Sequence, residues 1–87
     1  MCIIIVANKN KKIPNEHIKL ASELNCDGFG ISASVNNKLF VYKSISINSD
    51  DIIKLYNSIR QVATGDIVVH FRLATHGDIS DKLCHPF

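Results

Sequence analysis

The sequence predicts one small α+β domain in the order strand, helix, strand, strand, helix, strand. Three observations predict it: a run of β-branched residues at the start, two segments with helical spacing of apolar residues, and an Asn-Asn turn between two strand-like segments. The 87 residues allow one domain at most, and 46% apolar residues are enough to form a core. We therefore treat residues 1–87 as a single folded unit with a thin core.

The first half of the chain supplies a strand, a helix and a second strand. The run CIIIVAN predicts a buried strand, and KNKK predicts the turn that follows it. Pro14 suits the first turn of a helix that ends near Asn25, with an apolar stripe formed by Ile18, Ala21 and Leu24. The Asp-Gly pair in CDGFGIS breaks this helix and opens the second strand.

The second half begins with a hairpin. VNNK predicts its turn, because asparagine tolerates the left-handed conformation, and the alternation in KLFVYKS suggests a third strand covered on both faces. Ser49 is the expected N-cap of a second helix that ends at Thr64-Gly65. Its expected buried stripe consists of Ile52, Leu55, Tyr56 and Ile59. DIVVHFRLA predicts a fourth strand, and THGDISDKLCHPF is loop-like.

The composition excludes several classes of protein. The net charge is +2 with mixed signs, and the one basic run, KNKK, is typical of a solvated loop rather than a nucleic-acid patch. No apolar run approaches the roughly 18 residues of a membrane span. The three cysteines share no metal or redox spacing, which indicates free thiols and a cytoplasmic protein.

The N-terminus carries a candidate nucleophile. Cys2 follows the initiator Met1, and cysteine is small enough for the methionine to be removed. The new terminus would hold a thiol and a free α-amine, and such amines have a pKa of about 7.7–8.0, which suits a base near neutral pH. The structural alternative is a small apolar residue at the start of a buried strand.

The fourth strand ends on an arginine. Strand alternation places His70, Arg72 and Ala74 on one face. The chain has eight lysines but two arginines, and only the planar guanidinium pairs bidentately with a carboxylate. We interpret Arg72 as a carboxylate receptor, with a salt bridge at the sheet edge as the alternative.

These residues lead to a family. HFRLATHG, residues 70–77, resembles the HxRxATHG signature of class II glutamine amidotransferases, which are N-terminal-nucleophile hydrolases. Three further landmarks follow the same order: MC with its apolar residues is similar to the family's MCGI opening, NCDGFGISA to GYDSAGIA, and CHPF to the HP after the ATHG loop. Together these landmarks span almost the whole chain.

The resemblance implies a fold, a reaction and a site. The fold would be the N-terminal half of an αββα sandwich. Cys2 would attack the side-chain amide of L-glutamine with its own α-amine as the base, releasing ammonia and then glutamate. Arg72 would bind the α-carboxylate of glutamine, and Thr75 and His76 would line the pocket. No cofactor or metal is implied.

The sequence departs from the family pattern at several points. Residue 3 is Ile where the family has Gly, and Leu73 replaces a bulky aromatic residue. The Asn-Gly pair that supplies the family's oxyanion hole, and the later Asp that binds the α-amino group of glutamine, do not occur. We therefore expect a domain truncated at its C-terminus: a fragment, half of a split enzyme, or a reduced protein kept for binding. A second chain or self-association would complete the sandwich.

Two alternatives stay open. The first is a zinc site, because the chain offers ligand types at His70, His76, Cys84 and His85, although their spacing fits no usual zinc pattern. The second is a non-catalytic binding or regulatory protein built on the same fold. Metal analysis tests the first alternative, and a measurable glutaminase rate argues against the second.

Overall fold

A computed structural model of the chain describes residues 2–25 and 27–72. The strands are β1 (Cys2–Ala7), β2 (Gly28–Val35), β3 (Lys38–Ser44) and β4 (Ile67–Arg72). The helices are α1 (Asn15–Leu24) and α2 (Ser49–Val62). The α+β class that the sequence predicts is confirmed.

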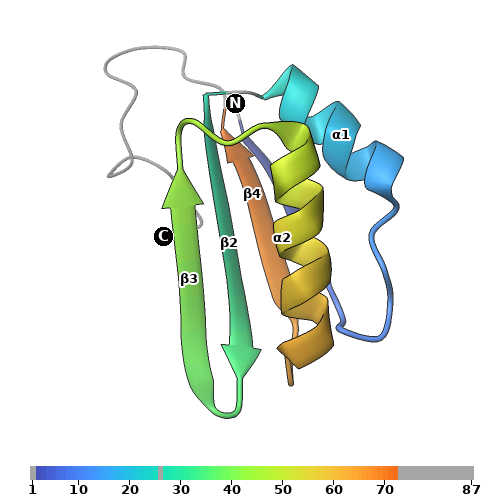
Figure 1. Cartoon of the computed structure of the whole chain (residues 1–87), viewed down its shortest axis with the longest axis vertical. Coiled ribbons are helices and arrows are strands. Elements are labelled where there is room, and N and C mark those ends of the chain that lie inside the picture. The colour runs from blue at the N-terminus through green and yellow to red at the C-terminus, as the bar shows by residue number, and fades with distance from the viewer. Residues whose placement is uncertain (1, 26, 73–87) are drawn as a thin grey trace.

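The four strands form one antiparallel sheet in the order β1-β4-β2-β3. Both helices lie on the same side of this sheet, so the described part of the chain has one sheet layer and one helical layer (Figure 1). The first and last strands are neighbours, with Cys2 at the start of β1 opposite Arg72 at the end of β4. The sheet therefore brings the two ends of the described chain side by side.

The N-cap of helix α2 differs by one residue from the predicted one. The N-cap is Asn48 rather than the predicted Ser49: the Asn48 side-chain oxygen accepts a hydrogen bond of 2.9 Å from the Asp51 backbone N–H. Asparagine caps a helix as well as serine does, so Asn48 competes with Ser49 for this position. The helix ends at Val62, and Ala63 follows as its C-cap.

Helix α1 buries a narrower stripe than the spacing predicts. Ile18 and Ala21 are buried, but Leu24 is 58% exposed. Three-residue steps fall short of the 3.6-residue turn, so each step moves the side chain roughly 60° around the helix axis. Leu24 has thus turned away from the sheet. Neither helix of the described part is long and apolar enough to cross a membrane.

The two outer strands are less covered than the sequence predicts. β1 was expected to be buried, yet its residues alternate between exposed and half-buried. β3 was expected to be covered on both faces, yet residues 38–42 are all exposed. The physical reason is their position: each lies at an edge of the sheet, where the single helical layer covers little of it.

The hairpin between β2 and β3 confirms the predicted turn. Asn36 and Asn37 both have positive φ values, 51° and 65°, as a two-residue hairpin turn requires. The turn also contacts the segment that follows α2, because the Asn36 N–H donates to the Thr64 hydroxyl oxygen at 3.1 Å. This contact fixes the hairpin end of the sheet against the helical layer.

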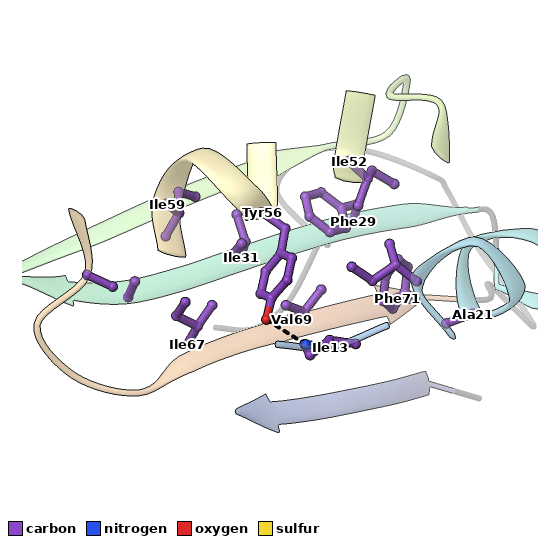
Figure 2. Close-up of a cluster of buried hydrophobic side chains, with 13 residues drawn as sticks. Ile13, Ala21, Phe29, Ile31, Ile52, Tyr56, Ile59, Ile67, Val69 and Phe71 are labelled. Atoms are coloured by element: carbon purple, nitrogen blue, oxygen red, sulfur yellow. Dashed lines mark hydrogen bonds between the residues drawn. The ribbon is translucent and has the colours of Figure 1, made fainter. Parts of the chain in front are cut away.

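The core lies between the helices and one face of the sheet. It is one cluster of buried side chains from both helices, the C-cap of α2, β2, β4 and the loop before α1: Ile13, Ile18, Ala21, Phe29, Ile31, Ala33, Ile52, Tyr56, Ile59, Ala63, Ile67, Val69 and Phe71. Tyr56 is fully buried, and its hydroxyl oxygen accepts a hydrogen bond of 2.9 Å from the Ile13 backbone N–H (Figure 2). Tyr56 thereby connects α2 to the loop that precedes α1. Leu55, predicted to be buried as well, is half-buried at the margin of this cluster.

Candidate active site

The sheet has a second face, on the side away from the helices, which we call the far face. The register of the strands assigns to it the residues that alternate with the core. Its members are Cys2, Ile4 and Val6 of β1; Val68, His70 and Arg72 of β4; Gly28, Gly30, Ser32 and Ser34 of β2; and Leu39, Val41 and Lys43 of β3. All residues that are both described and proposed for the chemistry lie on this face.

Cys2 and Arg72 are direct cross-strand partners. They oppose each other in the β1–β4 register, and directly opposed residues place their Cβ atoms about 4.5–5.5 Å apart on the same face. Cys2 is exposed and Arg72 is half-buried, so the thiol is accessible from solvent. The predicted nucleophile and the predicted carboxylate receptor therefore meet at one end of the far face.

Glycine follows Arg72 across the sheet. Gly28 is the β2 partner of Arg72, and Gly30 is the β2 partner of His70. Neither glycine has a side chain, yet both are buried, as is His70 beside Gly30, so this part of the far face is covered rather than open. In the sequence, Gly28 marked only the break after the first helix, and Gly30 had no assigned role. Only the register between β2 and β4, which pairs residues about forty positions apart, shows that they border Arg72 and His70.

The end of β4 is held by the connection between α1 and β2. The Asp27 backbone N–H donates to the Arg72 carbonyl oxygen at 2.8 Å, and Asn25 Nδ2 donates to the Phe71 carbonyl oxygen at 3.3 Å. Asn25 is 2% exposed, and its own N–H closes the last turn of α1 onto Ala21. Because the buried Asn25 side chain holds the carbonyl of Phe71, the residue before Arg72, it helps to position the backbone of Arg72. In the sequence, Asn25 marked only the end of a helix, so this role was not predicted.

His70 lies further along the far face. It is 3% exposed, and its cross-strand neighbours are Ile4 on β1 and Gly30 on β2. Of the four residues considered for zinc, His70 alone lies in the described part of the chain. Within residues 2–25 and 27–72 no group of three metal-ligating side chains comes together. The zinc alternative therefore gains no support from the residues that can be placed.

Two predicted pocket residues are not among the residues that the structure describes. Thr75 and His76 lie outside the described residues, so their relation to Cys2 and Arg72 stays a prediction. The site as described consists of the exposed Cys2 thiol, the Arg72 guanidinium on the adjacent strand, and the two glycines of β2 on the other side of β4. This arrangement is suited to holding an anionic group at Arg72 while a neighbouring carbon meets the Cys2 sulfur.

Two hollows in the described part of the chain are lined by neither Cys2 nor Arg72. An apolar groove of about 630 Å³ runs between α2 and the β2–β3 hairpin, lined at the strand end by Val35 and Lys38. Val35 is at the opposite end of β2 from Gly28, roughly 23 Å away along the strand. A second cavity beside Asn25 and Gly28 measures about 30 Å³, which suits water but not an amino acid.

Comparison of the chain with protein-family models, with curated proteins and with solved structures finds no match.

Proposed function

We propose that this chain is a class II glutamine amidotransferase-type half-domain, which hydrolyses the side-chain amide of L-glutamine through Cys2. The proposal rests on the resemblance of HFRLATHG and the N-terminal MC to that family. The observation that supports it most is the β1–β4 register, which opposes Cys2 and Arg72 on one face of the sheet. Nothing in the spacing of residues 2 and 72 along the chain required that pairing.

The proposed reaction uses the two residues in separate roles. Arg72 holds the α-carboxylate of glutamine through a bidentate pair of hydrogen bonds, which presents the side-chain amide toward the neighbouring strand. The α-amine of Cys2, free once Met1 is removed, takes the thiol proton, and the sulfur adds to the amide carbon. The C–N bond breaks as the amine returns the proton to the leaving ammonia. Water then cleaves the thioester to give glutamate and the free thiol.

The fold proposed with this function is half of an αββα sandwich. Its support is the far face, where Ile4 and Val6 are 61% and 64% exposed next to Cys2. Exposed apolar side chains on a sheet face favour a second layer over solvent. We propose that this layer comes from residues other than those described, for example a second chain or a second copy of this one, and that it supplies the oxyanion donors. The same exposed residues support the alternative function, a non-catalytic binding or regulatory protein on this fold.

An arginine-to-lysine pair tests the carboxylate role. Arg72→Lys keeps the positive charge but loses the bidentate fork, so we expect glutamine binding to weaken by a factor of about 10 to 100. Calorimetric titration with L-glutamine measures it. Arg60→Lys is the matched control, because Arg60, the other arginine of the chain, lies on α2.

The outcomes separate the two candidate functions. Weaker binding in Arg72→Lys only, together with ammonia release by the wild type, supports the hydrolase. Glutamine binding that depends on Arg72 but yields no ammonia, even with a completing chain present, supports the binding protein. If Arg72→Lys binds glutamine as the wild type does, Arg72 is not the carboxylate receptor.

A further inference from the structure

The outer edge of β3 is unusually exposed for a strand of this composition. Residues 38–42 are all exposed, and four of them are large apolar or aromatic residues: Leu39, Phe40, Val41 and Tyr42. A natural edge strand is normally shielded by charged side chains, above all lysine, or by proline, a bulge or an inward-pointing charge. β3 has no proline and pairs with β2 without a bulge, and its lysines lie near its two ends, at positions 38 and 43, so residues 39–42 between them carry no charge.

The edge also presents main-chain groups. β3 pairs with β2 along one side only, and no described strand lies on its other side. Every second residue of an antiparallel strand directs its N–H and C=O away from its neighbour, so the outer side of β3 is a template for another strand. A partner at this edge must therefore supply an extended segment.

The sequence of β3 fits a second copy of itself. Antiparallel pairing about Val41 is the register that pairs all seven residues, Lys38 to Ser44. In that register Val41 meets Val41 of the other copy, Phe40 meets Tyr42, Leu39 meets Lys43, and Lys38 meets Ser44. Aromatic pairs stabilise such a ladder, and no lysine opposes another lysine. Opposed residues also share a face, so the core side of one sheet continues the core side of the other.

We propose that two copies of this chain pair through the β3 edges, antiparallel about Val41, so that their four-stranded sheets join into one continuous sheet. The interface uses the free edge of β3 and side chains on both of its faces, including Phe40, which lines the groove along α2, and Tyr42. This interface is independent of the proposed hydrolase function, because the Cys2–Arg72 pair lies in the β1–β4 ladder, at the opposite edge of the sheet from β3.

The test is a set of charge variants at the symmetry axis. Sedimentation velocity over a range of concentrations is expected to show a wild-type dimer. Val41→Lys and Val41→Glu each place two like charges opposite each other, and each is expected to raise the dissociation constant at least about tenfold. Mixing the two variants opposes lysine with glutamate and is expected to restore a dimer that contains one of each.

Val6→Lys is the matched control. Val6 is also an exposed valine of the far face on an edge strand, but on β1 at the other edge. We expect it to leave the dimer intact, with circular dichroism confirming that all variants are folded. A wild type that stays monomeric up to about 1 mM overturns the proposal. So does a Val6→Lys variant that dissociates as Val41→Lys does, because the interface is then the far face, or a Lys/Glu mixture that forms no dimer.

Discussion

A Cys2→Ala variant is expected to lose all covalent capture of a diazo-ketone analogue of glutamine. The analogue alkylates the sulfur that would otherwise attack the amide, and alanine has no sulfur. Alanine is as small as cysteine, so removal of Met1 and the free α-amine are expected to persist. The variant should therefore bind glutamine reversibly as the wild type does, which separates the loss of chemistry from the loss of the site. Mass spectrometry of the treated protein measures the capture.

The other two cysteines of the chain provide the controls for this prediction. Cys26→Ala and Cys84→Ala each keep Cys2, so both variants are expected to react with the analogue as the wild type does. An adduct that persists in Cys2→Ala and disappears in Cys26→Ala or Cys84→Ala would place the reactive thiol elsewhere. The same result would remove the functional meaning of the Cys2–Arg72 pairing.

Tyr56→Ala is expected to destabilise the fold more than any other single substitution of the described core. Tyr56 is fully buried, so truncation removes the ring contacts and leaves a cavity, at a cost of about 3–5 kcal/mol. It also leaves the Ile13 N–H without its 2.9 Å acceptor. A domain of this size has a total stability of about 5–15 kcal/mol, so the variant should be largely unfolded in mild denaturant.

Tyr56→Phe isolates the hydrogen bond. It keeps the ring and removes the hydroxyl, and we expect it to cost about 1–3 kcal/mol because the buried Ile13 N–H loses its partner. Urea denaturation measures both variants. Tyr42→Phe is the control: Tyr42, the other tyrosine of the chain, is 37% exposed on β3, and its hydroxyl should matter little. Equal effects of Tyr56→Phe and Tyr42→Phe would mean that the Ile13 contact contributes nothing to stability.

Local pattern in the sequence was sufficient for much of the fold. The Asn-Asn turn, the break before Gly28 and the stripe on α2 depend on neighbours within a few residues, and each is found in the structure. Two details could not be predicted from local pattern. Three-residue spacing did not decide whether Leu24 faces the core, and Asn48 and Ser49 are both suitable N-caps, so packing determines which one is used.

Strand order was beyond the reach of the sequence. The burial of a strand depends on whether it is central or at an edge, and that depends on pairings between distant residues. β1 and β3 have sequences as apolar as a central strand, yet both lie at edges. Likewise, the residues that border Arg72, namely Gly28 through the sheet and Asp27 through its backbone, are evident only once β2 is known to pair with β4.

The measurement that tests the central claim most directly is the intact mass of the purified wild-type chain before and after treatment with the glutamine diazo-ketone. The claim is that Cys2, at the N-terminus and opposite Arg72, is a nucleophile in a glutamine site. We expect a chain without Met1 that gains one adduct, located at Cys2 by peptide mapping and suppressed by excess L-glutamine. A chain that retains Met1, or one that has lost Met1 and gains no adduct at Cys2, would contradict the claim.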